Sequence, residues 1–263
     1  MRTCSLLTIL LLLSFTQVHC MTRKERFFSI FNIVSFENSV CTSDDNLMGG
    51  MTRRGRTDLT IAVSGVCYTS SQCREMNGQP RGTCASGFGT CCLFISDGMN
   101  ELKVLERKVG YIQNPNYPRD NSSTFRETVE IRPISEKIRQ IRLDMIDFEV
   151  TLARFKSSNL TSKMDPGTEE EPCNIHRVRV LLPEENVNIG DLCGDNNGQH
   201  LYIHLDHNTR RYGQAAPVRL ELEFSGERKR YQYNIKVEQL DFTISEDIQR
   251  MAPLGCQQYF TGG

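Results

Sequence analysis

The sequence has no tryptophan, and aromatic residues make up 8% of its 263 residues. It also has no excess of charge: 31 Lys and Arg residues stand against 32 Asp and Glu residues, a net charge of −1, and the basic residues are scattered. Without a basic patch or an aromatic stacking platform, the composition argues against nucleic acid or an anionic membrane surface as the partner. Beyond the N-terminus, no segment approaches the roughly 18–20 apolar residues of a membrane helix. We therefore expect neither nucleic-acid binding nor membrane insertion.

Signatures of common hydrolases are also missing. The chain contains no Gly-x-Ser-x-Gly nucleophile turn and no His-Glu-x-x-His zinc motif. Asp144, Asp147 and Glu149 lie close together, but alternation along a strand would place Asp144 on the opposite face from the other two. A catalytic carboxylate pair is therefore not expected, and neither is an enzyme.

Three histidines gather in one short stretch, at His200, His204 and His207. On a strand the first two share a face and the third points to the other. A metal site there would need ligands from other loops. Structural or surface roles are the favoured interpretation, so we expect no bound metal.

The N-terminus has the form of a secretory signal peptide. Arg2 precedes an apolar run, Leu6–Leu13, which is too short to cross a bilayer, and Val18 and Cys20 fit a cleavage site. We expect residues 1–20 to be removed after Cys20 and the mature chain to be secreted. Residues 21–40 are interpreted as an N-terminal arm.

Eleven cysteines are the most informative feature of the composition. In an exported chain they favour disulfides rather than metal binding. Residues 41–95 form a small cysteine-rich module that lacks a Cys-x-x-Cys zinc pattern and is too short to bury a sufficient core without cross-links. A bond between Cys91 and Cys92 would strain the backbone, so each should reach a different partner. The fifteen possible pairings remain open among Cys41, Cys67, Cys73, Cys84, Cys91 and Cys92.

The remaining cysteines of the mature chain number three. Cys173 and Cys193 enclose a strand and a loop and should pair with each other. Cys256 is then left without a partner in the chain, because nine cysteines follow the predicted cleavage site. A disulfide-linked partner through Cys256 is possible.

The central part of the chain predicts an antiparallel β-sandwich. In Gln140–Val150, Ile141, Leu143 and Met145 alternate with Arg142 and Asp144, which indicates a half-buried strand. Further short apolar segments, separated by turn residues, supply its partners. They are Val178–Leu182, Leu201–Leu205, Val218–Phe224 and Tyr231–Leu240.

Two N-glycosylation sequons lie in turn-rich stretches, at Asn121 and Asn159. Sites of this kind suit an exported chain. We expect both asparagines to carry glycans.

Several motifs together resemble a CUB domain, here spanning residues 100–243. They are the Asn-Pro-Asn-Tyr-Pro turn within Gly110–Pro118, the Ile141–Phe148 strand, the Cys173/Cys193 pair with Gly194, and Tyr233–Val237. The segments around the cysteines of residues 41–95 are similar to the leader of secreted arthropod CUB proteins. Residues 244–263 are interpreted either as a C-terminal tail or as the start of a truncated further unit. The resemblance implies a CUB-like jelly-roll β-sandwich, all-β in class, preceded by a small disulfide-rich module.

The chain departs from the family pattern at two sites. The resemblance implies acidic calcium ligands at the positions of Thr151 and His176, and a third in Ser225–Arg230, which has no Asp. We therefore expect no calcium and no other cofactor. The first family disulfide is also missing, because Glu101–Lys108 and Thr124–Glu130 contain no cysteine. Packing alone is expected to stabilise that region.

The resemblance implies a secreted, non-catalytic module that recognises an extracellular protein or glycan. Two alternatives remain. In the first, the chain is the non-catalytic regulatory portion of a secreted protease. In the second, it is a venom or salivary effector in which disulfides provide durability.

Overall fold

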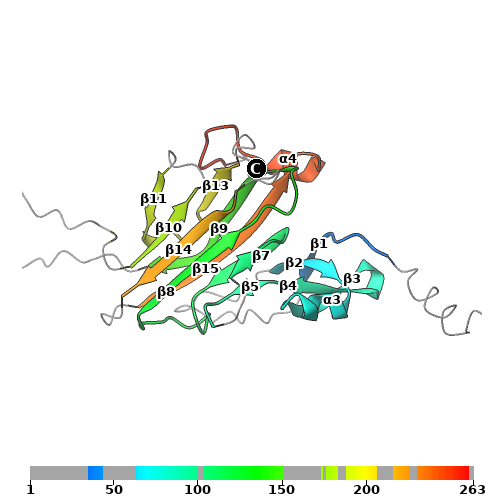
Figure 1. Cartoon of the computed structure of the whole chain (residues 1–263), viewed down its shortest axis with the longest axis horizontal. Helices are drawn as coiled ribbons and strands as arrows, with labels where there is room; N and C mark the ends of the chain where they lie inside the picture. The colour runs from blue at the N-terminus through cyan, green and yellow to red at the C-terminus, as the bar shows by residue number, and fades with distance from the viewer. Residues whose placement is uncertain are drawn as a thin grey trace, which may run out of the picture. The chain divides into compact units, whose positions relative to one another are not determined.

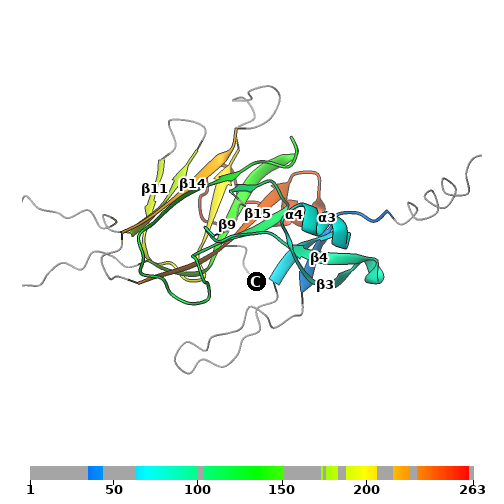
Figure 2. The ribbon, with the colours of Figure 1, turned by 60° about the horizontal axis from the view of Figure 1, so that its bottom comes forward.

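The computed structural model describes residues 35–43, 63–99, 103–150, 173, 176–182, 188–205, 216–225 and 230–260. The predicted signal peptide, most of the arm, Thr151, Asn159 and His207 lie outside these residues. Residues 38–263 form one compact unit. Figures 1 and 2 show its strands from two directions.

A four-stranded sheet forms the cysteine-rich module, in the order β1-β2-β4-β3. One helix, α3 (Ser70–Glu75), accompanies it, and Thr69 and Gln72 close its first turn with a reciprocal capping box. The strands are β1 (Val40–Ser43), β2 (Val63–Tyr68), β3 (Gln79–Cys84) and β4 (Gly89–Leu93), with a short 3₁₀ turn at Ala85–Gly87.

Three disulfides cross-link this module: Cys41–Cys91, Cys67–Cys84 and Cys73–Cys92. Cys91 and Cys92 are neighbours on β4, so their side chains point to opposite faces of the sheet. One therefore bonds to β1 and the other to α3, which fixes both elements to the same strand.

The sandwich consists of two further sheets. The five-stranded sheet has the order β11-β10-β14-β8-β6, and the six-stranded sheet contains β12-β9-β15-β7-β5, with β13 also paired to β9. The pairs β5–β7 and β6–β8 are parallel, and the remaining pairs in these sheets are antiparallel. The all-β sandwich expected from the sequence, preceded by a disulfide-rich module, is confirmed.

The bounds of the strands follow the sequence pattern closely. Val218–Phe224 forms β14 with the bounds expected. The five-stranded sheet also contains β6 (Val104–Leu105), β8 (Phe125–Ile131), β10 (His176–Leu181) and β11 (Asn188–Leu192). The six-stranded sheet contains β5 (Ile95–Ser96), β7 (Val109–Gln113), β9 (Ile138–Val150), β12 (Gly194–Asp195), β13 (His200–His204) and β15 (Tyr231–Asp241); α4 (Ser245–Arg250) follows β15.

Strand β9 turns its apolar residues into the core, but its register against β15 shifts twice: once between Ile138 and Gln140, and once beside Met145. Met145 pairs with Ile235 and Asp147 pairs with Asn234, so Ile146 is an extra residue in the ladder. The bulge shifts the phase by one, and Met145 and Phe148 are both buried. Asp147 therefore shares the outward face with Asp144. The expectation that Asp144 faces away from Asp147 and Glu149 was wrong, because a bulge cannot be read from a single strand.

The cysteine-rich module and the sandwich share one continuous hydrophobic core, which includes Val66 and Phe94 from the module side. A tyrosine strengthens the junction. The hydroxyl of Tyr111 on β7 donates to the carbonyl oxygen of Ser64 at 3.0 Å and accepts from its amide nitrogen at 2.9 Å. Burial and the nearby carboxylates outweigh the Ser64 bonds and raise the pKa of Tyr111 to about 12. The phenol therefore keeps its proton and satisfies both backbone groups.

An ion pair joins two segments without cysteine, one that begins at Lys103 and the other Thr124–Glu130. Lys103 Nζ contacts Glu127 Oε1, and the Lys103 carbonyl accepts from the amide of Glu130 at 2.9 Å. The Glu127 side chain is 4% exposed and that of Lys103 is 46% exposed. We expected packing alone to stabilise this region. The structure adds an ion pair between a cation and a buried carboxylate that connects the same two segments.

Candidate recognition face

The outward side of the five-stranded sheet is lined with charge. Strands β8, β10 and β14 alternate buried residues, all apolar except Glu127 and His176, with polar residues that point out. Antiparallel register then places the outward residues of neighbouring strands side by side. We call the resulting surface the charged face; it consists of Arg126, Glu130, Arg177, Arg179, Asp191, Arg219, Glu221 and Glu223.

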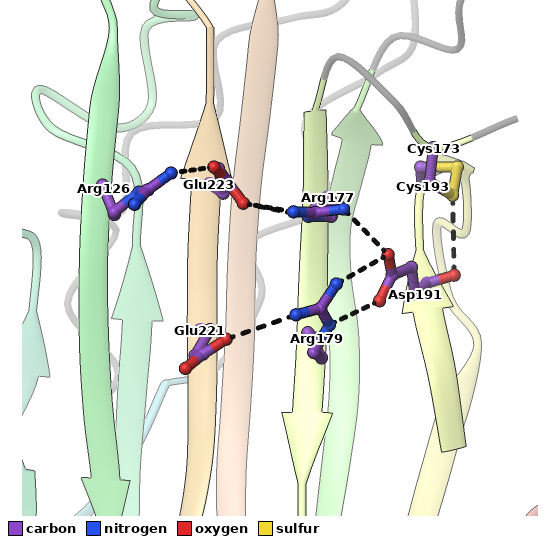
Figure 3. Close-up of polar contacts among 8 residues, drawn as sticks. All are labelled: Arg126, Cys173, Arg177, Arg179, Asp191, Cys193, Glu221 and Glu223. Carbon is purple, nitrogen blue, oxygen red and sulfur yellow. Dashed lines mark hydrogen bonds and ion pairs between the residues drawn. A yellow bond between two sulfur atoms is a disulfide. The ribbon is translucent and has the colours of Figure 1, made fainter. Parts of the chain in front are cut away.

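One row of the charged face crosses four strands, as Figure 3 shows. Arg126 pairs with Glu223 through its NH2 group. The other oxygen of Glu223 accepts from Nε and NH2 of Arg177, at 3.0 and 2.7 Å. Arg177 NH1 in turn lies 3.5 Å from Asp191 Oδ2. Charges alternate along the row, so Glu223 lies between two guanidinium groups and Asp191 ends the row.

A second row lies beside the first and shares Asp191 with it. Arg179 donates from Nε to Asp191 Oδ1 at 2.9 Å and from NH2 to Oδ2 at 3.4 Å. On its other side, Arg179 NH1 is 3.7 Å from Glu221 Oε2. A third contact joins β14 to β8 at the opposite end of these strands from Arg126 and Glu223. There Arg219 Nε lies 3.1 Å from Glu130 Oε1.

The electrostatics of the face follow from these contacts. Hydrogen bonds from Arg177 hold the pKa of Glu223 below its usual value, and those from Arg179 do the same for Asp191. Arg132, assisted by Arg219, lowers the pKa of Glu130. Glu223, Asp191 and Glu130 are therefore held in the ionised form. Four arginines and four acids give the eight residues of the face a formal charge of 4 − 4 = 0, and Arg132, which follows β8 and bonds Glu130 at 2.7 Å, adds one positive charge at the rim.

This arrangement orders the arginines without exhausting their donors. A guanidinium carries five N–H groups in a fixed plane. The side chains of Arg126 and Arg219 are 75% and 52% exposed, whereas those of Arg177 and Arg179 are 29% and 33% exposed. The two exposed groups therefore present further donors to solvent, while the two inner groups hold the carboxylates in place.

The disulfide Cys173–Cys193 lies at the edge of the charged face (Figure 3). It links Cys173, just before β10, to Cys193, which directly follows β11. Cys173 Sγ lies 3.5 Å from the carbonyl oxygen of Asp191. The cross-link therefore fixes the end of the strand that carries Asp191.

The other residues singled out in the sequence lie away from this face. Asn121 is half-buried beside Tyr231, and its Oδ1 accepts from the Ser123 hydroxyl at 2.8 Å. His176 is buried, with its ring 5.6 Å from that of Phe224. His200 and His204 share the outward side of β13. The described residues contain no group of three or more His, Cys, Asp or Glu side chains placed to hold a metal.

The charged face was not anticipated from the sequence, although the signal was present. The segments FRETVEI, HRVRV and VRLELEF alternate apolar residues with charges of both signs. Alternation gave the outward positions, but the pairing of signs depends on which strands are neighbours. In the part of the chain that the structure describes, no helix is long and apolar enough to span a membrane.

Comparison with known proteins gives similarities of structure alone. No family model matches the chain, and no curated protein is similar to it in sequence. Among solved structures, the extracellular region of zebrafish Gpr126/Adgrg6 is similar at 17% identity and a TM-score of 0.33, over 52% of this chain and 14% of that one. The CUB1-EGF-CUB2 domains of rat MASP-1 match at 17% identity and a TM-score of 0.33, over 59% of this chain and 48% of that one. At such TM-scores neither similarity bears on function.

Proposed function

We propose that the chain is a secreted, non-catalytic recognition module of the CUB type that binds an extracellular protein through the charged face. The observation that carries the proposal is the set of arginines that carboxylates hold in place across four strands. The four disulfides support an extracellular setting, because such bonds persist in oxidising compartments.

Pre-ordering is what makes the face suitable for binding. Immobilising a flexible side chain at an interface costs about 0.5–1.5 kcal/mol. The inner arginines are already held by their carboxylates, so part of this cost does not arise on association. Arginine is also enriched among the residues that dominate binding energy. Because the face is neutral as a whole, a protein surface of mixed polar groups suits it better than a polyanion, with partner carboxylates opposite Arg126 and Arg219.

The test compares two double variants. Arg126→Ala/Arg219→Ala removes the exposed donors of the face, and Arg74→Ala/Arg119→Ala removes two other exposed arginines with the same change of charge. Each purified mature chain is immobilised and exposed to extracellular fluid of the source. A protein retained by the wild type and by the control, but lost with the first variant at unchanged thermal stability, would support the proposal. Equal retention by both variants would contradict it.

Secretion and glycosylation are parts of the same proposal. We expect the secreted chain to begin at Met21 and to lose mass on enzymatic removal of N-glycans. At Asn121, the bonds that Oδ1 accepts from Ser122 and Ser123 leave the amide nitrogen of the side chain as the attachment atom. Replacement of Asn121 by Gln should remove one glycan. A secreted chain of unmodified mass would contradict this part.

Cys256 offers a covalent route to a partner. It is a free, half-buried cysteine in the described part of the chain. We propose that its thiol and a thiol of a second chain form a disulfide, losing two protons and passing two electrons to a thiol oxidant of the secretory pathway. The native secreted form should then lose a component on reduction, and Cys256→Ser should abolish the larger species. A single mass with and without reductant would contradict the proposal.

The two alternatives differ from this proposal in context, not in the face. A transcript that continues into a protease domain would favour the regulatory portion of a protease. Expression confined to venom or salivary glands would favour the effector.

A further inference from the structure

The end of the described chain is bound to the outer side of β13. We call Met251–Phe260 the strap; Figure 1 draws it in red beside β13. The amide of Tyr202 on β13 donates to the carbonyl oxygen of Gln257 at 2.7 Å. Met251 and Cys256 pack against a small cluster of Tyr202, Leu240 and Ala252. The strap thus occupies the edge of β13 that β9 does not.

A buried glutamine fixes where the strap begins. The Gln140 side chain on β9 accepts from the amide of Ala252 at 2.9 Å and donates from Nε2 to the Ala252 carbonyl at 2.7 Å. These two hydrogen bonds determine which arm of the Gln140 side-chain amide is the oxygen and which is the nitrogen. The second hydrogen on Nε2 is directed to His204 Nδ1, at 3.2 Å.

The orientation of the Gln140 amide determines which ring nitrogen of neutral His204 carries the hydrogen. Since Gln140 Nε2 can only donate, Nδ1 of His204 must accept and therefore carries no hydrogen. The other ring nitrogen, Nε2, lies 3.0 Å from the carbonyl oxygen of Cys256, which can only accept. The hydrogen of the neutral ring is therefore on Nε2. In this form the ring satisfies both contacts and joins β9 to the strap.

A second proton on His204 breaks this arrangement. It would place an N–H on Nδ1 against an N–H of Gln140, donor against donor. Gln140 cannot rotate its amide to compensate without losing both bonds to Ala252. Histidine side chains change charge between about pH 5 and pH 8. Mild acid therefore acts on a bond that holds the strap.

Among the described residues, no carboxylate bonds to His204. On β9, Arg142 and Asp144 pair with each other at 2.7 Å, and the Arg139 guanidinium lies over the ring of Phe242. Near α4, Glu238 pairs with Arg250 and Asp247 with Lys108, Asp241 accepts from Thr243, and Glu246 is exposed. In the described strap, the titratable side chains are Cys256 and Tyr259. The two ring nitrogens of His204 contact neutral groups, the Gln140 amide and the Cys256 carbonyl.

His200, four residues before His204 on the same strand, provides a contrast. Its Nε2 lies 2.9 Å from the carbonyl oxygen of Tyr259 and 3.3 Å from its amide nitrogen. Asp144 stands opposite His200 in the β9–β13 register. A charged His200 keeps an N–H for the Tyr259 carbonyl and faces a carboxylate. Protonation there does not remove the shorter contact.

We propose that His204 makes the strap a pH-sensitive latch, which is closed at neutral pH and shifts toward release in mild acid, uncovering the edge of β13. This device is independent of the charged face, which lies on the other sheet. An uncovered edge would present the backbone of β13 to an extended segment of another chain.

Hydrogen exchange at two backbone amides tests the latch. The Tyr202 amide is bonded to the strap, whereas the Leu205 amide is bonded to Arg139 of β9. Their protection factors, corrected for the chemical exchange rate, are measured by NMR in the full mature chain at pH 7.5 and 5.5. We expect protection of Tyr202 to fall about three- to tenfold, the factor for one hydrogen bond. Protection of Leu205 should not change.

Three variants make the result specific. His204→Gln keeps a donor for Cys256 but cannot take up a proton, so the change with pH should vanish. His200→Gln should retain it. Gln140→Glu supplies an acceptor for a protonated ring but loses the donor to the Ala252 carbonyl, so protection of Tyr202 should be lower than in the wild type at pH 7.5 and should not fall further at pH 5.5. Protection of Tyr202 that is equal at both pH values in the wild type would overturn the proposal. A pH effect that persists in His204→Gln would overturn it as well.

Discussion

The carboxylate of Glu238 should make a large, pH-dependent contribution to stability. Its side chain is 3% exposed on β15, and Arg250 of α4 contacts both of its oxygens, with NH2 at 2.7 Å from Oε2. Lys236 Nζ lies 3.2 Å from the same oxygen. Burial pushes the pKa of Glu238 upward, but the bonds and charges of Arg250 and Lys236 outweigh it and bring the pKa to about 2.

The size and sign of the effect follow by linkage. A drop from the usual 4.5 to about 2 corresponds to about 3 kcal/mol of unfolding free energy. Because the folded-state pKa is lowered, this stability is fully present above pH 4.5 and is lost as the pH falls toward 2. At pH 3 about 1.5 kcal/mol should remain.

The test is urea denaturation of Glu238→Gln against the wild type. The variant should be less stable by about 3 kcal/mol at pH 7, and the difference should shrink to about half at pH 3. Glu246→Gln, an exposed acid on α4, serves as the control and should change stability by less than about 0.5 kcal/mol at either pH. A loss below about 1 kcal/mol at pH 7, or a loss that does not vary with pH, would refute the reasoning.

Three further predictions concern other cross-links in the fold. In chemical denaturation, Lys103→Met should lower the unfolding free energy by about 3 kcal/mol, because it leaves a buried carboxylate without its cation. The double variant Lys103→Met/Glu127→Leu should lose much less, and equal losses in the two variants would contradict this. Tyr111→Phe should cost about 1–3 kcal/mol by the same assay, since two backbone groups lose their partner, and an unchanged midpoint would count against the junction described. Under mild reductant, Cys173–Cys193 should open first, as detected by alkylation and mass spectrometry. Both of its cysteines are half-exposed, whereas each disulfide of the cysteine-rich module includes a buried cysteine, and the reverse order of opening would contradict this.

Strand positions could be predicted from the sequence because alternation is a local property. The pattern of Ile141, Leu143 and Met145 gave the buried face of β9, and Val218–Phe224 was predicted with the bounds observed. Burial of every second side chain leaves this signature within each strand. The same reasoning failed one residue later, at Ile146, because a bulge depends on how β15 is paired.

The candidate face and the strap depend on contacts between distant residues. Arg126 and Glu223 lie 97 positions apart, and Gln140 and Ala252 lie 112 apart. Nothing local in the sequence states that these residues are neighbours. The ion pair of Lys103 and Glu127 could have been sought where the resemblance placed a lost disulfide, since the two segments still had to be joined.

The most direct test of the recognition role is an arginine footprint of the complex. Once a bound protein has been captured from extracellular fluid, phenylglyoxal labelling is compared for the free and the bound chain by mass spectrometry. The account predicts that Arg126 and Arg219 become protected while Arg74 and Arg119 react as before. Unchanged labelling of Arg126 and Arg219 in a saturated complex would contradict it.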